Sequence, residues 1–259
     1  MQDKVIVITG ASSGIGAELA QVAAARGAAG VVLAARREPE LRAVAERLGE
    51  RAEVVVSDVS RRADNERLLA RSVERFGRVD VWVANAGRGI TRPVSQLTDA
   101  DVDEMFATNF KSVLYALQTA VPHFRARGRG QLIAVSSMLG RIPYVHVRSA
   151  YSAAKAAVNS LMASARLEVR PDLPEVHFTT VMPGVVGTPF GAAALHGGPD
   201  SRVLPMAQPV GEVAEVIADA IERPRAEVYS RPAYAEMVAR YYTAEDVGAL
   251  EAGPPFVSR

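Results

Sequence analysis

The sequence contains no cysteine, and this absence excludes disulfide bonds, cysteine-ligated metals and thiol catalysis. Lysine is also scarce: of the 30 basic residues, only Lys4, Lys111 and Lys155 are lysines. No apolar run reaches the roughly 18 residues of a membrane-spanning helix, and the chain enters a strand-like stretch directly after Lys4, so no signal peptide is expected. With a formal net charge of +1, no excess field favours nucleic acid or an anionic membrane. We therefore expect a cytoplasmic protein without a metal, nucleic-acid or membrane partner.

Short apolar runs that predict β-strands alternate with longer stretches that predict helices. The expected strands are residues 5–9, 31–33, 53–57, 79–84, 131–135, 177–182 and 227–229. The expected helices are residues 17–26, 38–48, 62–76, 99–127, 149–168 and 214–221. Pro122 is expected to kink or divide the fourth of these helices. This alternation predicts an α/β fold, a doubly wound parallel sheet with helices on both faces, and no repeat or linker divides residues 1–259 into more than one domain.

A glycine-rich turn, Gly10–Gly16, joins the first expected strand to the first expected helix. Its glycines let the backbone turn tightly and approach a pyrophosphate, which sits at the N-terminus of the following helix. A plain turn is the alternative for such a loop taken alone, but the flanking strand and helix favour nucleotide binding.

The second expected strand lacks an acid at its tip, where Ala35 leads into Arg36 and Arg37. NAD enzymes place an acid there for the ribose 2′-hydroxyl, whereas a guanidinium suits a 2′-phosphate by charge and by its forked donors. We therefore predict NADP(H), with Arg36 as the main contact and Arg37 as a residue that can share its role. The alternative is a pair of solvated arginines at the start of a helix.

Tyr151 and Lys155 stand four residues apart in an alanine-rich helical stretch, so they project from one face. A lysine ammonium beside a phenol favours the phenolate and lowers a pKa that is ordinarily about 10. Such a tyrosine could exchange a proton with a substrate oxygen near neutral pH. An ordinary surface pair is the alternative. The remaining polar candidates Asp58, Asn85 and Ser137 also follow expected strands, and their convergence at one sheet edge favours the functional interpretation.

Together these pieces resemble the short-chain dehydrogenase/reductase family. The matching elements are Thr9-Gly-x3-Gly-x-Gly16, Asp58-Val59, Asn85-Ala-Gly87, Asn109, Ser137, Tyr151-x3-Lys155 and Pro183-Gly184 followed by Thr188. The resemblance covers residues 4 to about 190. It implies one domain around a seven-stranded parallel sheet, reversible hydride transfer between NAD(P)(H) and an alcohol or carbonyl, and a homo-oligomer, either a tetramer or a dimer.

The resemblance also implies a role for each catalytic candidate. Tyr151 would be the acid/base, Lys155 would lower its pKa and hold the nicotinamide ribose, and Ser137 would hydrogen-bond the substrate oxygen. Asn109 would anchor a proton-relay water. The spacing from Ser137 to Tyr151 is one residue longer than usual, which leaves Ser136 as an alternative. The cofactor contacts expected from the motifs and the resemblance together are Gly10, Ser12, Ser13, Gly14, Ile15, Gly16, Arg36, Arg37, Asp58, Val59, Asn85, Ala86, Gly87, Tyr151, Lys155, Pro183, Gly184, Val186 and Thr188.

Residues 189–209 are rich in glycine, alanine and proline and predict a mobile lid over the substrate. The apolar candidates Phe190, Leu195 and Met206 favour an uncharged small-molecule ketone, aldehyde or secondary alcohol, as for a carbonyl reductase. Residues 251–259 are expected to be a tail, either disordered or folded over a neighbouring subunit. Two alternatives to an NADP(H)-dependent oxidoreductase are a non-catalytic NADP-sensing or interaction protein and a lyase or epimerase that retains its cofactor.

Overall fold

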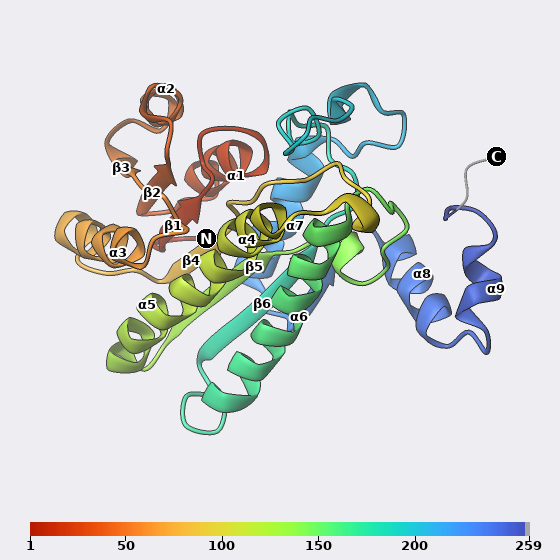
Figure 1. Cartoon of the computed structure of the whole chain (residues 1–259). Coiled ribbons are helices and arrows are strands. Elements are labelled where there is room, and N and C mark those ends of the chain that lie inside the picture. Colours follow the sequence, from red (N-terminus) through yellow and green to blue (C-terminus); the bar gives the residue numbers. More distant parts are fainter. Residues whose placement is uncertain (257–259) are drawn as a thin grey trace.

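Seven parallel strands form one sheet in the order β3-β2-β1-β4-β5-β6-β7 in the computed structural model, which describes residues 1–256 (Figure 1). The strands are β1 Val5–Thr9, β2 Gly30–Ala35, β3 Ala52–Val56, β4 Val81–Ala84, β5 Gly130–Val135, β6 Val176–Met182 and β7 Glu227–Tyr229. The strand order reverses between β1 and β4, and open α/β sheets hold their ligands beyond the carboxyl ends of the strands at such a reversal. The predicted doubly wound parallel sheet is confirmed.

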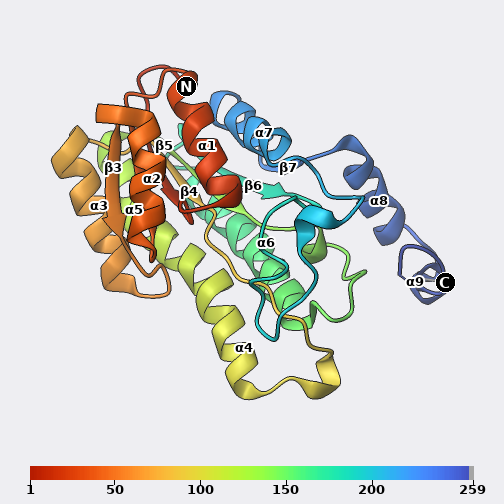
Figure 2. The ribbon, with the colours of Figure 1, turned by 90° about the horizontal axis from the view of Figure 1, so that it is seen from above.

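Helices cover both faces of the sheet. On one face lie α1 (Gly14–Ala25), α2 (Glu38–Leu48) and α7 (Val210–Glu222), and on the other lie α3 (Arg62–Phe76), α5 (Ser112–Arg127) and α6 (Ser149–Val169). Figure 2 shows α1 beside α7, with α5 and α6 across the sheet from them. In β1, Ile6 and Ile8 face the first layer and Val7 faces the second. Because both faces are covered, β1 and β4 are apolar apart from Thr9.

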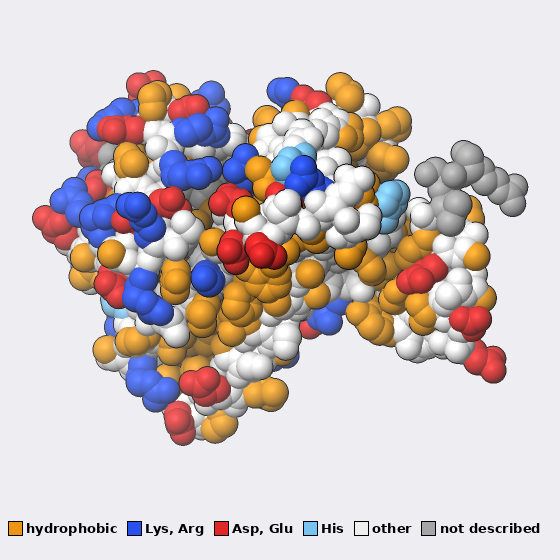
Figure 3. Space-filling model, viewed as in Figure 1, with side chains coloured by type: hydrophobic (Ala, Val, Ile, Leu, Met, Phe, Trp, Pro, Cys, Tyr) orange, Lys and Arg blue, Asp and Glu red, His pale blue; other side chains and the backbone are white. Residues whose placement is uncertain are grey.

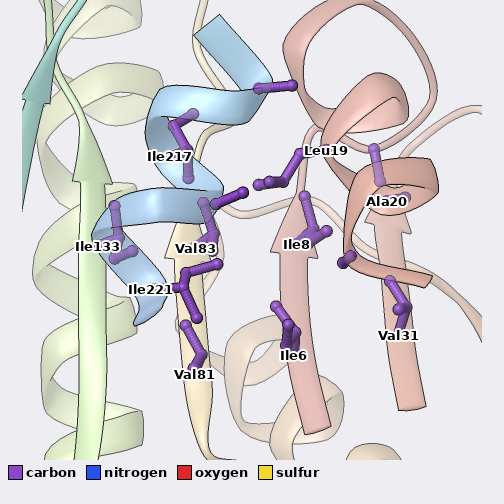
Figure 4. Close-up of a cluster of buried hydrophobic side chains, with 14 of the residues drawn as sticks. Ile6, Ile8, Leu19, Ala20, Val31, Val81, Val83, Ile133, Ile217 and Ile221 are labelled. Carbon is purple, nitrogen blue, oxygen red and sulfur yellow. The ribbon is translucent and has the colours of Figure 1, made fainter. Parts of the chain in front are cut away.

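The core on the α1 side joins β1, β4 and β5 to α1 and α7 (Figure 4). Ile8, Leu19 and Ile217 meet there with no exposed surface. Each fully buried side chain of this kind contributes about 1.5–3 kcal/mol relative to an exposed one. Ala20 adds little volume, so α1 lies close to the sheet. This packing holds the carboxyl ends of the strands in fixed relative positions.

The helical region at residues 99–127 is divided at Asn109 and not at Pro122. It consists of α4 (Asp99–Phe106), a π-helical turn (Ala107–Lys111) and α5, which continues through Pro122. The Asn109 amide holds the wide turn, because its Nδ2 donates to the carbonyl oxygens of Met105 (3.0 Å) and Arg88 (2.9 Å). The prediction that Pro122 is the point of division is therefore wrong, since tertiary contacts of Asn109 place the break.

Two helices that the sequence analysis did not predict follow the sheet. They are α8 (Pro232–Tyr242) and α9 (Val247–Glu251), which project from one end of the body and contain no buried residue (Figures 1 and 2). Of the expected tail at residues 251–259, residues 257–259 lie outside the described part of the chain. Within residues 1–256, every helix is too short or too polar to span a bilayer.

Candidate active site

The loops after β1 and β4 are hydrogen-bonded to each other at the reversal of strand order. The Thr9 hydroxyl accepts from the backbone N–H groups of Asn85 (3.0 Å) and Ala86 (3.1 Å). In return, the Asn85 Nδ2 donates to the Thr9 carbonyl oxygen at 2.9 Å. The segment Asn85–Gly87 and the glycine-rich turn therefore form one rigid rim at the carboxyl edge of the sheet.

The glycine-rich turn leaves an open backbone surface at the start of α1. A Cβ at Gly16 would lie 2.5 Å from the Gly10 carbonyl oxygen, and one at Gly14, where φ is +56°, would lie 3.1 Å from Thr188 Cγ2. A side chain at Gly16 would collide with backbone, and one at Gly14 would be strained by the positive φ and would crowd Thr188. Ser13, the N-cap of α1, makes no side-chain capping bond, so the first N–H groups of the helix are available to a phosphate. The turn thus fits the pyrophosphate of a dinucleotide.

Arg37, and not Arg36, reaches the glycine-rich turn. Its Nη2 donates to the hydroxyl oxygens of Ser12 and Ser13, each at 3.0 Å, while its Nη1 pairs with Glu40 at 3.0 Å. Arg36 is exposed and has no ion pair or side-chain hydrogen bond within residues 1–256. Of the two arginines, Arg37 is therefore the one held against the glycine-rich turn by the protein's own contacts.

Other expected cofactor contacts line the same edge. Asp58 follows β3, and its Oδ1 accepts from the backbone N–H (3.0 Å) and the hydroxyl (2.6 Å) of Ser60, so it stabilises the turn that leads to α3. The Pro183 carbonyl oxygen accepts from the Met138 N–H at 2.8 Å, which joins the loops after β5 and β6. Val59, Ile15 and Val186 contribute backbone or apolar surface beside these groups: the Val59 carbonyl accepts from Asn65, Ile15 packs on the core, and Val186 bridges to Gln208.

The four catalytic candidates lie together and are buried. The exposed fractions are 0% for Asn109, 3% for Lys155, and 7% each for Ser137 and Tyr151. Lys155 Nζ donates to the Val135 carbonyl oxygen at 2.8 Å and lies 5.7 Å from the centroid of the Tyr151 ring. The structure therefore brings residues from α6, the end of β5 and the π-helical turn to one place.

Gly87 allows this close approach. A Cβ at Gly87 would lie 2.8 Å from Asn109 Oδ1 and 3.6 Å from Lys155 Nζ. Ser136 and Ser137 are also distinguished, because the Ser136 hydroxyl donates to the Lys155 carbonyl oxygen at 3.2 Å. The Ser137 hydroxyl accepts from the Leu139 N–H at 3.1 Å and lowers the pKa of Tyr151. Of the two serines, Ser137 is thus the one beside the phenol.

Burial raises the pKa of Tyr151 to about 12, although the Ser137 hydroxyl and the Arg148 guanidinium act in the opposite direction. Burial likewise lowers the pKa of Lys155 to about 8. The sequence analysis predicted that Lys155 would lower the pKa of Tyr151. In the structure the pKa of Tyr151 is raised instead, and burial is the largest cause. The reason is that desolvation disfavours the charged form of both residues, while Lys155 directs its ammonium to the Val135 carbonyl oxygen.

Arg148 is a further residue of the site that the sequence analysis did not single out. Its Nη1 donates to the Ile90 carbonyl oxygen at 3.1 Å, and a Cβ at Gly89 would lie 2.9 Å from both Arg148 Nη1 and Phe190 Cε1. The Phe190 ring is 5.5 Å from the Tyr151 ring. No carboxylate within residues 1–256 pairs with Arg148. The available signal was its position directly before the helix that carries Tyr151, where Arg148 is the N-cap of α6.

The expected lid, residues 189–209, is held against the segment before α4. Leu195 N–H donates to the Gly89 carbonyl oxygen at 2.8 Å, and its own carbonyl accepts from the Thr91 N–H at 2.9 Å. His196 Nε2 lies 2.7 Å from Asp101 Oδ1 in the first turn of α4. Phe190 and Leu195 pack with the cluster that contains Tyr151, whereas Met206 is 61% exposed. The front half of the lid therefore forms one wall beside Tyr151.

The chain is similar in sequence to a known family and its members. A family model described as short chain dehydrogenase matches residues 4–197. An uncharacterized oxidoreductase of Bacillus subtilis, YxnA, is 36% identical over 236 residues, which are 88% of this chain and 65% of that protein. This chain therefore spans just under two thirds of the length of that relative.

Solved structures share the fold over most of the chain. A short-chain dehydrogenase/reductase from Burkholderia phymatum in complex with NAD has a TM-score of 0.87 at 24% identity, covering 100% of this chain and 98% of that one. An alcohol dehydrogenase from the archaeon Thermococcus sibiricus, complexed with 5-hydroxy-NADP, has a TM-score of 0.78 at 29% identity, covering 90% and 98%. The two similar structures thus carry different nicotinamide cofactors.

Proposed function

Since the chain belongs to the short-chain dehydrogenase/reductase family, we propose that it is an NADP(H)-dependent oxidoreductase that interconverts an uncharged ketone or aldehyde and the corresponding alcohol. The observation that carries this proposal is the burial of Tyr151 and Lys155 beside Ser137 and Asn109, next to an open glycine-rich turn. Burying a lysine ammonium costs folding free energy, and groups with strongly shifted pKa values cluster at functional sites. A protein that only binds a partner would not need a buried phenol and a buried ammonium at the same sheet edge.

The chain's own residues supply position and a proton. When bound, the nicotinamide supplies or accepts the hydride. Tyr151 is protonated at neutral pH, because its pKa is about 12, so its hydroxyl donates to the carbonyl oxygen during reduction. Ser137 donates a hydrogen bond to the same oxygen. The Arg148 guanidinium favours the phenolate that forms after proton transfer, and Lys155 beside it would hold the nicotinamide ribose.

Asn109 acts through its position in the π-helical turn. Its side-chain amide is already engaged, since Oδ1 accepts from the Arg88 N–H at 3.1 Å and Nδ2 donates to two carbonyl oxygens. We assign to this turn the task of holding the relay water that returns a proton to Tyr151. The turn is wider than an α-helical one, and such turns occur frequently at functional sites.

The preference for NADP(H) rests on Arg37. The contacts of Arg37 with Ser12 and Ser13 hold its guanidinium at the mouth of the glycine-rich turn, near the end of β2. Ala35 at that end adds no negative charge, so the tip of β2 itself would not repel a 2′-phosphate, and the Arg37 guanidinium would exchange its pairing with Glu40 for the phosphate. Ser12 and Ser13 would add hydroxyl donors to the same phosphate.

We also propose a homo-oligomer built on the face of α5 and α6. Hydrophobic side chains gather over these two helices in Figure 3. Val121, Leu161 and Ala165 are only partly buried there, and so is Phe110 in the adjoining π-helical turn. Closed two-fold symmetry is the common way to cover such a face. Light scattering at micromolar concentration tests this, and a monomeric mass would contradict it.

The activity itself is tested by following NADPH absorbance with a panel of ketones, aldehydes and diketones. Oxidation of NADPH with at least one uncharged carbonyl, together with the reverse reaction from its alcohol, is the expected result. A cofactor-retaining lyase or epimerase would convert substrate without net change in NADPH. A sensor would bind NADPH, as measured by fluorescence, and convert no member of the panel.

A further inference from the structure

A second feature lies at the amino edge of the sheet, opposite the active site. A hollow of about 250 Å³ opens between the C-terminal end of α6, the start of β6 and the segment before β7. Figure 1 shows the end of α6 and the beginning of β6 together, far from the lid. Arg166 lies fifteen positions after Tyr151 in α6, which corresponds to roughly 22 Å along the helix axis. The lining residues are Arg166, Arg170, Pro174, Val176, His177, Phe178, Pro224, Arg225 and Ala226.

The charge in this hollow is of one sign. Arg166, Arg170 and Arg225 line it, and its lining contains no aspartate or glutamate. None of these three arginines forms an ion pair within the part of the chain that the structure describes. The only other titratable side chain of the lining is His177. The grouping therefore places three guanidinium groups around one concave surface without a protein counter-charge.

An adjoining hollow of about 360 Å³ shows that this is not a general property of the amino edge. The two hollows share His177 and Pro224. The larger one contains Lys4 and two arginines, but it also contains Asp3, Asp80, Glu175 and Glu222, so its charges offset each other. Only the smaller hollow keeps its positive charge uncompensated.

A helix terminus explains part of this charge but not all of it. Arg166 and Arg170 lie at the C-terminal end of α6, where the helix dipole favours cations. Arg225 comes from the separate segment between α7 and β7 and gains nothing from that dipole. Two lining residues, Val176 and Phe178, are apolar and only 4% and 3% exposed. The hollow therefore offers apolar surface beside the guanidinium groups.

We propose that this hollow binds a small phosphate-bearing anion, at a site separate from the cofactor. Guanidinium groups match phosphate oxygens in charge and in the geometry of their forked donors, and three of them reach the space from two segments of the chain. The volume of about 250 Å³ is large enough for a phosphate monoester or a pyrophosphate. The formal net charge of +1 also disfavours a nucleic acid as the partner.

Calorimetric titration of pyrophosphate into the full-length protein loaded with NADP⁺ tests this site, because loading removes the glycine-rich turn as a competing phosphate site. The wild type is expected to show saturable binding at low salt. The double variant Arg166→Gln/Arg170→Gln should weaken it at least tenfold, because each lost charge-assisted hydrogen bond is worth about that factor or more. Arg225→Gln, on an independent exposed segment, should weaken it in the same direction.

The matched control is Arg47→Gln/Arg125→Gln. These two arginines lie in the last turns of α2 and α5 and have no ion pair within residues 1–256. Their replacement removes the same formal charge as the double variant of the hollow, but from two other helix ends. Binding equal to the wild type is expected for this control. Absence of saturable binding to the wild type, or equal losses in control and hollow variants, would overturn the proposal. Titrations with inorganic phosphate and with glycerol phosphate then distinguish a free ion from an organic monoester.

Discussion

The active site and the arginine-lined hollow lie at opposite edges of the sheet, and their polar side chains differ in burial and in hydrogen bonding. At the carboxyl edge, Asn109 and Lys155 are almost fully buried, and each donates to named backbone oxygens. At the amino edge, Arg170 and Arg225 are exposed and have no ion pair within residues 1–256. One edge holds its groups in place before any ligand arrives, while the other offers charge that a ligand must organise.

This difference separates a site for chemistry from a site for electrostatic binding. A fixed, buried group acts at a defined atom and costs stability, because desolvation disfavours its charged form. Lys155 demonstrates that cost, since burial lowers its pKa to about 8. Exposed arginines cost the fold little stability, because they remain hydrated, and they attract an anion mainly through their summed positive charge. Substitutions at the two edges should therefore differ in kind, with loss of turnover at one and loss of anion affinity at the other.

The largest effect is expected for Tyr151→Phe. Removing the hydroxyl should lower turnover at least ~100-fold, the lower range for a lost general acid. NADPH binding should stay close to that of the wild type, because the ring that packs against Phe190 is retained. Steady-state kinetics and NADPH fluorescence titration measure the two quantities. Near-normal turnover in the variant would remove Tyr151 from the mechanism.

Cofactor choice should change next most strongly. The wild type is expected to prefer NADPH over NADH roughly ten- to a hundred-fold in kcat/KM, since charge-assisted hydrogen bonds contribute about 1.5–3 kcal/mol. The double variant Ala35→Asp/Arg37→Ala should reverse that order, mainly through the apparent KM of the cofactor. Arg36→Ala is the matched control and should keep the preference, because Arg36 makes no contact with the glycine-rich turn. Equal use of both cofactors by the wild type would contradict this account of Arg37.

A smaller effect that depends on pH is expected for Arg148→Met. Without this cation the pKa of Tyr151 should rise further above about 12, so less phenolate is present at any lower pH. Alcohol oxidation at pH 9 should fall about three- to tenfold, as one pKa unit is a factor of ten. Carbonyl reduction at pH 7 should change less, because it needs the protonated phenol. Arg148→Lys should restore part of the oxidation rate, whereas equal losses in both directions at every pH would indicate a purely structural role.

The smallest effect concerns stability. Lys155→Met should raise the free energy of unfolding at pH 7 by about 1 kcal/mol, or ~2–4 °C in Tm, because a buried charge is replaced by an apolar chain of similar shape. The pKa of Lys155 is lowered to about 8 in the fold from about 10.4 in the unfolded chain. The loss of stability that this buried charge causes is therefore complete below pH 8, and it disappears as the pH rises toward the unfolded-state pKa of about 10.4.

Thermal melts of the wild type and Lys155→Met between pH 7 and pH 10 check this sign. The difference in Tm between the two proteins should shrink as the pH increases. A difference that stays constant over this range would mean that the charge on Lys155 carries no such cost.

Much of the fold could be predicted because its signals are local. The run Val5–Thr9 is both the expected strand and β1, since a short continuous run rich in apolar β-branched residues is typical of a buried parallel strand. The break at Asn109 could not be predicted, because it depends on a contact with Arg88, 21 residues away in the chain. The helices α8 and α9 were missed because their residues are not buried against the body.

The candidate site shows the same limit. Its location followed from the spacing of polar residues after successive strands, because the carboxyl ends of parallel strands meet at one edge. The direction of the Tyr151 pKa did not follow, since the degree of burial is invisible in a helix-face pattern. Nor could spacing predict that Arg37, and not its neighbour Arg36, would contact Ser12 and Ser13.

The most direct test of the central claim is the fate of a label. NADPH deuterated at both C4 positions of the nicotinamide is incubated with the wild type and an accepted ketone, and the product alcohol is examined by mass spectrometry. Transfer of one deuterium to the carbinol carbon, with a slower rate than for unlabelled NADPH when chemistry limits turnover, is the predicted result. Product that contains no deuterium, formed while NADPH is unchanged, would contradict net hydride transfer at this edge of the sheet.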